Sequence, residues 1–299
     1  MKSAVITGAT GAIGTALINE LTSRGVRVLV LTREDSPRNS RIPQSPLAEV
    51  RYCSLEELHD FEAEGEYEVF YHLAWAGAFG SARNDLYLQN KNVEYALDAV
   101  AAAKRLGCHT FIGAGSQAEY GRAEGILKPD TPAFPENGYG YGKLCAGQMT
   151  RDFAHRLGLR HIWVRILSVY GPNDGGGSMV MSALKKLRDG EIPEFTKGEQ
   201  KWDYLYSGDA AEAFALLGEK GVDGKVYVLG SGNARPLAEY IEELRRTAAP
   251  NGKVNIGAVP YGDKQVMFLC ADISELQKDT GWKPATDFSD GIGKIIENT

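Results

Sequence analysis

The stretch Gly8-Ala9-Thr10-Gly11-Ala12-Ile13-Gly14 decides the fold, because it separates a strand expected at residues 4–7 from a helix expected at residues 12–24. Glycines in this position let the chain turn sharply, approach a diphosphate and pack helix against strand. The start of the helix offers free N–H groups to phosphate oxygens. A plain tight turn is the alternative, but the flanking strand and helix favour a dinucleotide-binding loop. The expected contacts are Gly8, Gly11, Ala12, Ile13 and Gly14.

Short apolar runs alternate with longer helical patterns through the first half of the chain. Further strands are expected at residues 26–31, 68–74, 109–113 and 161–166, and helices at about residues 85–106 and 139–157. Strands that alternate with helices are typical of a parallel sheet with helices on both faces. We therefore predict an α/β fold with a Rossmann-type, doubly wound parallel sheet.

The pattern loosens after Gly171-Pro172 and continues without repeats or a flexible linker. A glycine-rich loop is expected at residues 173–178, helices at 179–187, 207–217 and 236–247, and a strand at 225–229. We predict a dinucleotide-binding Rossmann domain over residues 1–167. Residues 168–299 would form mainly a smaller C-terminal α/β lobe that binds substrate, with about residues 204–230 as a candidate return to the first domain.

Composition excludes several classes of protein. The formal net charge of −6 argues against a surface that coats nucleic acid. The four cysteines have no C-x-x-C spacing, so we expect neither disulfides nor a metal site. No apolar run approaches the roughly 20 residues that span a bilayer. The first residues lead directly into a strand rather than a signal peptide, so we expect a cytoplasmic protein with no membrane partner.

The end of the second expected strand selects the cofactor. An acidic side chain there would bind the ribose hydroxyls of NAD, whereas an arginine accommodates the 2′-phosphate of NADP. Thr32 and Arg33 hold this position, and Glu34 and Asp35 follow too late to be the usual ribose ligand. The alternative interpretation is that Arg33 is a solvated cation in a loop and binds no phosphate. The sequence favours NADP(H) as cofactor and leaves NAD(H) open.

Tyr139 and Lys143 stand four residues apart on one face of an expected helix. A phenol with a pKa near 10 becomes a better acid–base catalyst when an adjacent ammonium stabilises the phenolate. Gly140 and Gly142 each disfavour the helix that they occupy by about 1 kcal/mol, a local inconsistency expected where function overrides propensity. Ser116 follows an expected strand end, where open α/β sheets bind ligands. We predict Ser116, Tyr139 and Lys143 as the catalytic residues.

These motifs resemble those of the extended short-chain dehydrogenases/reductases, which modify sugar nucleotides. Five more runs fit the resemblance, namely His72-Leu73-Ala74, Asn92-Val93, the segment from Arg165 to Pro172, Asp203-Tyr204-Leu205-Tyr206 with Asp209, and Gly281-Trp282-Lys283-Pro284. The resemblance implies that Leu73, Ala74, Asn92, Tyr139 and Lys143 contact the dinucleotide. It also implies a nucleotide sugar as substrate and a homodimer as the assembly.

Two positions depart from the family pattern. Ser168 stands where the family usually has an asparagine, and Trp202 stands where an arginine usually binds the nucleotide diphosphate, with Lys201 beside it. The indole of Trp202 would either stack on a base or pack the lobe. The expected substrate contacts are Ser116, Gln117, Ser168, Lys201 and Trp202.

The residues after Ser116 narrow the reaction. Relatives that dehydrate sugar nucleotides carry an acid and a base where this chain has Gln117 and Ala118, and neither side chain can transfer a proton near neutral pH. Glu119 should point away if the segment is extended. The remaining reaction is hydride transfer at a carbinol or carbonyl, either as ketone reduction or as an epimerisation by oxidation and reduction.

Three functions stay open from the sequence. The first is NADPH-dependent reduction of a nucleoside-diphosphate 4-keto-6-deoxysugar, and the second is 4-epimerisation with tightly held NAD. The third is a non-catalytic dinucleotide-binding sensor or scaffold, which the presence of Ser116, Tyr139 and Lys143 disfavours.

Overall fold

The computed structural model describes residues 1–263 and 265–298. Its centre is a seven-stranded parallel sheet in the order β11-β6-β5-β4-β1-β2-β3. The strands are β1 (Ser3–Thr7), β2 (Arg27–Thr32), β3 (Ala48–Tyr52), β4 (Val69–His72), β5 (Thr110–Ser116), β6 (Arg160–Ile166) and β11 (Val226–Leu229). The strand order reverses between β1 and β4, which confirms the predicted Rossmann-type fold.

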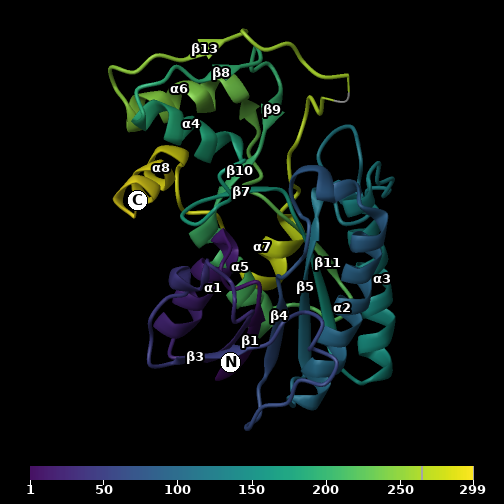
Figure 1. Cartoon of the computed structure of the whole chain (residues 1–299). Helices are drawn as coiled ribbons and strands as arrows, with labels where there is room; N and C mark the ends of the chain where they lie inside the picture. Colours follow the sequence, from purple (N-terminus) through teal and green to yellow (C-terminus); the bar gives the residue numbers. More distant parts are fainter. Residues whose placement is uncertain (264, 299) are drawn as a thin grey trace.

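Helices cover both faces of this sheet (Figure 1). One face carries α1 (Ala12–Ser23), α5 (Ser207–Lys220) and α7 (Ser274–Thr280), and the other carries α2 (Leu86–Arg105) and α3 (Gly138–Arg156). Successive side chains of a strand point to opposite faces, so Ile6 joins the core under α1 and α5, while Val5 joins the core under α2 and α3. Both faces of β1 are therefore fully buried.

A smaller lobe occupies the upper part of Figure 1. It contains α4 (Met179–Arg188), α6 (Leu237–Ala248) and α8 (Phe288–Glu297), which share one apolar core. Its short strand pairs are β8 (Glu194–Phe195) with β13 (Asn255–Ile256), and β9 (Lys201–Trp202) with β12 (Arg235–Pro236). A third pair, β7 (Ser168–Tyr170) with β10 (Tyr204–Tyr206), leads into α5. No helix in the described residues is long and apolar enough to cross a membrane.

The C-terminal segment is tied to the first lobe by Asp209. Its carboxylate accepts hydrogen bonds from the backbone N–H groups of Ala285 and Thr286, at 3.0 and 2.9 Å. The Trp282 indole donates to the Asp209 carbonyl at 3.0 Å and is 2% exposed. The run from Gly281 to Pro284, which resembles a family motif, therefore fastens the two lobes together.

Several elements differ from the sequence-based expectation. We did not predict β3, although Ala48-Glu49-Val50-Arg51-Tyr52 alternates apolar and polar residues; its residues 49–52 are exposed at the sheet edge. The short strands of the smaller lobe, α7 and α8 were also missed. β5 extends to Ser116, so this serine ends the strand rather than following it. The expected ends of the other helices and strands differ from the observed ends by at most three residues.

The glycine loop explains how α1 meets the sheet. Gly8 has a φ of +78°, and a Cβ atom there would lie 2.6 Å from the backbone nitrogen of Ala74. Only glycine allows this approach of two backbones. Gly11 has more space, because its Cβ would lie 3.8 Å from the nearest atom, the Gly8 carbonyl oxygen. Packing within the chain therefore does not require a glycine at position 11.

Candidate active site between the two lobes

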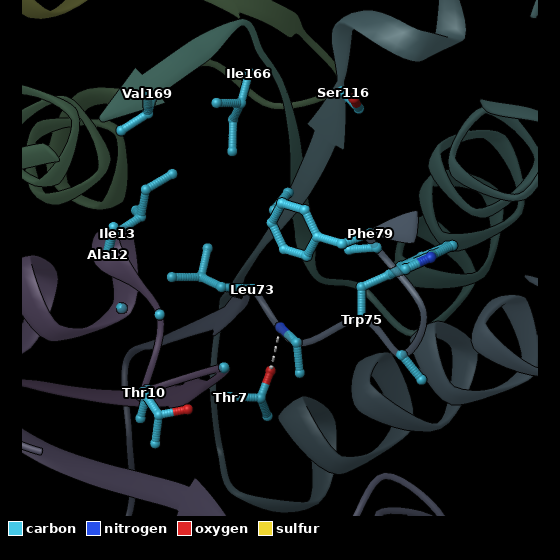
Figure 2. A pocket seen from close by; sticks show the side chains of 18 of the residues that line it. Thr7, Thr10, Ala12, Ile13, Leu73, Trp75, Phe79, Ser116, Ile166 and Val169 are labelled. Atoms are coloured by element: carbon cyan, nitrogen blue, oxygen red, sulfur yellow. Dashed lines mark hydrogen bonds between the residues drawn. The ribbon is translucent and has the colours of Figure 1, made fainter. Parts of the chain in front are cut away.

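A cavity of about 920 Å³ opens at the carboxyl ends of β1, β2, β4 and β5 and continues to the smaller lobe. Figure 2 shows Ile13, Leu73, Ile166 and Val169 around it, with Ser116 at the end of its strand. This is the edge where open α/β sheets bind ligands, next to the point where the strand order reverses.

The structure brings most of the predicted site residues together. The cavity is lined by Gly8, Gly11, Ala12, Ile13, Gly14, Arg33, Leu73, Ala74, Ser116, Tyr139, Lys143, Ser168 and Trp202. Three predicted residues do not line it. Gln117 is half-buried in the short helix η3 (Gln117–Glu119), Lys201 is exposed on β9, and Asn92 is buried under the cavity wall.

Asn92 supports the cavity wall from behind and does not line the cavity. Its side-chain amide donates to the carbonyl of Ala76 at 2.9 Å, and its side-chain oxygen accepts from the Ala76 backbone N–H at 2.8 Å. Asn92 therefore fixes the loop after β4, from which Trp75 and Phe79 project (Figure 2).

The cofactor half of the cavity fits the diphosphate of a dinucleotide. Helix α1 begins after Gly11, which has no side chain to cap the first N–H groups, so these donors face the cavity. The Thr7 hydroxyl accepts from the Ala74 N–H at 3.4 Å (Figure 2) and hydrogen-bonds His72 Nδ1 at 3.0 Å. These contacts hold the end of β4 against the glycine loop.

Two arginines lie at the end of β2. The Thr32 hydroxyl donates to the Asn39 side chain at 2.8 Å, and Asn39 donates to the Arg33 carbonyl at 2.8 Å. This folds the loop so that Arg38 lines the cavity together with Arg33. The sequence showed Arg33 but not Arg38, because nothing local indicates that the loop folds back.

One carboxylate also borders the cofactor half. Glu56 lines the cavity and accepts a hydrogen bond from the Tyr95 hydroxyl at 2.7 Å, which lowers the pKa of Glu56. Glu34 and Asp35, which follow Arg33, are not among the lining residues of the described chain.

Tyr139 and Ser116 meet at the far end of this half. Burial raises the pKa of Tyr139, and hydrogen bonding with the Ser116 side chain and the charge of Arg83 lower it in part. The Arg83 guanidinium lies 4.2 Å from the centre of the Tyr139 ring. A hydroxyl pair of this kind can hold a carbonyl oxygen and exchange a proton with it.

Lys143 lies beside two aromatic rings of the site. Its ammonium donates to the Ala114 carbonyl at 2.6 Å and sits 3.8 Å from the centre of a Trp75 ring, but 5.8 Å from the centre of the Tyr139 ring. Burial lowers the pKa of Lys143 to about 7. Lys143 thus faces both aromatic rings and lies closer to Trp75, and its role beside the phenol stays a prediction.

Trp75 and Arg83 are site residues that the sequence analysis missed. The Trp75 indole donates to Gln89 Oε1 at 2.7 Å and meets the Tyr139 ring edge-on at a centroid distance of 6.1 Å. A tryptophan directly after the run His72-Leu73-Ala74 was the available signal. The sequence around Arg83 gave no signal of a role in the site, because Arg83 lies in an irregular segment.

Glycines let α3 approach this cluster. A Cβ atom on Gly140 would collide with the Ala118 carbonyl, and one on Gly142 would lie 3.2 Å from the Trp75 ring. The poor helix propensity of this turn therefore serves the close contact that places Tyr139.

Ser116 is held from behind by Glu119. The segment after β5 turns into η3 instead of staying extended, so Glu119 is buried. Its Oε1 accepts from the Ser116 N–H at 2.8 Å, and its Oε2 accepts from Arg165 Nε at 2.7 Å. The Trp163 indole also donates to Oε1, at 2.9 Å. With both oxygens occupied and no place in the cavity wall, Glu119 cannot exchange a proton with substrate.

The substrate half differs in charge from the cofactor half. The Trp202 indole donates to the Ser168 hydroxyl at 2.7 Å, so the two departures from the family pattern form one contact. Asp174 lies nearby with one buried oxygen that has no hydrogen-bond partner in the described chain. Among the described lining residues, the lysines and arginines are Arg33, Arg38 and Lys143, all in the cofactor half.

Across residues 1–263 and 265–298, no group of three or more His, Cys, Asp or Glu side chains could hold a metal ion. All four cysteines are free thiols.

Comparison with known proteins gives both family and fold. Residues 4–230 match the family model described as "NAD dependent epimerase/dehydratase family". The chain is 26% identical to dTDP-4-dehydro-6-deoxyglucose reductase of Escherichia coli, with 98% of this chain and 96% of that protein covered. It is 24% identical to CDP-abequose synthase of Salmonella typhimurium, with 98% and 97% covered.

Solved structures resemble the fold across the whole chain. UDP-glucose 4-epimerase from Thermotoga maritima superposes with a TM-score of 0.87 at 22% identity, covering 99% of this chain and 97% of that one. UDP-N-acetylglucosamine 4-epimerase from Methanobrevibacter ruminantium M1 gives 0.88 at 20% identity, covering 100% and 99%. At this identity the likeness concerns the fold.

The geometry makes a prediction for Tyr139. Tyr139→Phe keeps the ring between Trp75 and Arg83 but removes the exchangeable proton, so turnover should fall by about 10²–10⁴-fold. Dinucleotide affinity should change little, because the glycine loop is untouched. Steady-state hydride transfer and cofactor titration measure the two effects.

Tyr141→Phe is the matched control, because the Tyr141 side chain is 51% exposed on another face of α3. An inactive Tyr141→Phe beside an active Tyr139→Phe would contradict the assignment.

Proposed function

The chain belongs to the NAD dependent epimerase/dehydratase family of short-chain dehydrogenase/reductase enzymes, and we propose that it uses NADPH to reduce a nucleoside-diphosphate 4-keto-6-deoxysugar. The observation that carries this proposal is that Ser116 and Tyr139 both line the cavity beside the glycine loop, while Gln117 and Ala118 stand where dehydrating relatives carry an acid and a base. That arrangement supports hydride transfer without elimination of water.

The proposed chemistry is a two-electron reduction of a carbonyl. When bound, the dinucleotide supplies the hydride that adds to the carbonyl carbon. The Ser116 hydroxyl donates a hydrogen bond to the carbonyl oxygen and polarises it. Tyr139 transfers its proton to that oxygen as the C=O π bond breaks, so the product is an alcohol. Lys143 orients the cofactor ribose from its place under Trp75.

The cofactor preference rests on the end of β2. Arg33 and Arg38 both line the cavity there, and their positive charges suit the extra phosphate of NADPH. Glu56 is the nearby lining carboxylate, and it is already engaged by the Tyr95 hydroxyl. We therefore propose NADPH over NADH.

The choice of a 4-keto-6-deoxysugar follows two curated relatives. One is named for the reduction of dTDP-4-dehydro-6-deoxyglucose and the other for the synthesis of CDP-abequose, and both align with almost the whole chain. Ser168 and Trp202 line the substrate half and are the proposed substrate contacts. Gln117 and Lys201 do not line the cavity, so we assign them no contact. A 4-epimerase would use the same catalytic residues but keep its cofactor through turnover.

A homodimer is the proposed assembly. Apolar side chains are unusually exposed on α2 and α3, including Tyr87 at 91%, Leu86 at 62% and Met149 at 45%. Exposed apolar side chains that gather on one face suit burial against a second copy of the same face.

The cofactor assignment predicts a selective loss. Arg33→Ala combined with Arg38→Ala should weaken NADPH binding at least tenfold more than NADH binding, because charge-assisted contacts to the extra phosphate disappear. Arg41→Ala is the control, since Arg41 is exposed in the same segment but does not line the cavity. Titration of nicotinamide fluorescence gives both affinities. Equal losses for the two cofactors, or tighter binding of NADH by the unchanged protein, would overturn the assignment.

The reaction type predicts that water is not lost. Elimination needs two additional proton transfers, each worth about 10²–10⁴-fold, and Gln117 and Ala118 can supply neither. Incubation with NAD⁺ or NADP⁺ and a panel of nucleoside-diphosphate hexoses should give no product lighter by one water, as measured by mass spectrometry. Formation of a 4-keto-6-deoxy product at rates competitive with ketone reduction would contradict this.

A further inference from the structure

The cation nearest the Tyr139 ring comes from outside the Tyr139–Lys143 motif. Arg83 belongs to the short helix η2 (Gly80–Asn84), and its guanidinium carbon lies 4.2 Å from the centre of the Tyr139 ring. The Lys143 ammonium is farther away, at 5.8 Å. A planar guanidinium stacked on a phenol is attracted to the ring electrons, and more strongly so to the electron-rich phenolate.

The fold fixes Arg83 in this position. Its Nη1 donates to the Ala78 carbonyl at 3.0 Å. The segment around it is fastened to α2 by Gln89, whose side-chain amide donates to the carbonyls of Gly77 and Ala82 at 3.1 and 2.9 Å. Gln89 is 1% exposed. Arg83 is therefore a placed side chain rather than a solvated surface cation.

Trp75 keeps the second cation apart from the phenol. One side of Trp75 receives the Lys143 ammonium at 3.8 Å, and its ring meets Tyr139 edge-on. Lys143 also gives a hydrogen bond to the Ala114 carbonyl. The lysine is therefore engaged on its own side of the indole, while Arg83 occupies a face of the phenol.

The other groups that face Tyr139 leave Arg83 as the dominant positive charge. Ser116 lies at the end of β5, where its side chain lowers the pKa of the phenol, and Glu119 in η3 has its carboxylate paired to Arg165. Lys143 faces it from α3 at the longer distance. In the described part of the chain, no carboxylate forms an ion pair with Arg83 within 4.0 Å, so its charge is not neutralised locally.

We propose that Arg83 is a positioning residue that stabilises the phenolate form of Tyr139 and so makes Tyr139 a stronger acid. The direction agrees with the physical cause, since a cation beside a phenol favours its charged form. The inference rests on the proposed function only in taking Tyr139 as the proton donor. It extends the catalytic apparatus to a residue outside α3, which carries Tyr139 and Lys143.

The test measures the ionisation of position 139 directly, without substrate. Tyr139 is replaced by 2,3,5-trifluorotyrosine, whose phenol ionises several pH units below that of tyrosine, and ¹⁹F NMR follows this single probe during a pH titration. Arg83→Gln should raise the midpoint by about one pH unit, a tenfold lower phenolate fraction at a fixed pH below the midpoint. Arg83→Lys should retain most of the wild-type value, because the charge remains.

Controls separate charge from folding. Arg246→Gln removes a charge from an arginine whose side chain is 66% exposed on α6, so it should leave the midpoint unchanged. Arg83→Met replaces Arg83→Gln if the latter does not give the wild-type circular dichroism spectrum. The fluorotyrosine titration stands even if the chain reduces no 4-keto sugar, so failure of the proposed function is distinguishable.

Two results would overturn the proposal. One is an unchanged midpoint in folded Arg83→Gln or Arg83→Met protein. The other is a larger upward shift in Lys143→Met than in Arg83→Gln, which would return the role to the lysine. A raised KM for substrate with an unchanged midpoint also contradicts it, since Arg83 would then be a substrate contact.

Discussion

Glu119 and Arg165 form an ion pair in the interior behind the active-site serine, with side chains only 1% and 6% exposed. Burying two charges costs several kcal/mol each, and removing one partner would leave the other uncompensated, a loss of about 3–5 kcal/mol. The pair joins β6 to η3, and the same carboxylate accepts the Ser116 N–H. The placement of Ser116 at the end of β5 depends on this interaction.

The two halves of the cavity are built in different ways. The cofactor half includes the glycine loop and the start of α1, where Gly11 has no side chain to cap the first N–H groups of the helix. The substrate half is formed by side chains that come together only when the smaller lobe folds, such as Trp202 against Ser168. A common cofactor with a variable substrate follows from this division, since changes in side chains alter one half and leave the other intact.

The sequence predicted what depends on local spacing. The glycine loop between strand and helix and the Tyr139–Lys143 pair one helical turn apart are readable from short segments, whereas the strand before Ser116 was predicted to end at residue 113. Arg38, Trp75 and Arg83 could not be placed, because their loops are positioned by side-chain hydrogen bonds of Asn39 and Gln89 that no sequence pattern indicates. The sequence analysis predicted that Glu119 points away from the site because it assumed an extended segment. The segment is in fact a helical turn, in which Glu119 is paired with Arg165. Lys143 was placed on the correct face, but its contact with Trp75 was invisible in the sequence.

The central claim is that the chain transfers a hydride from an exchangeable cofactor to a carbonyl carbon, with Tyr139 as the acid. The most direct measurement uses NADPH carrying deuterium at the transferred position, together with a nucleoside-diphosphate 4-keto-6-deoxysugar. The account predicts an alcohol product with deuterium at C4, formed by the wild-type protein and lost in Tyr139→Phe. A product inverted at C4 that carries no label from added cofactor would contradict it, because the hydride would then have come from the sugar and returned to it.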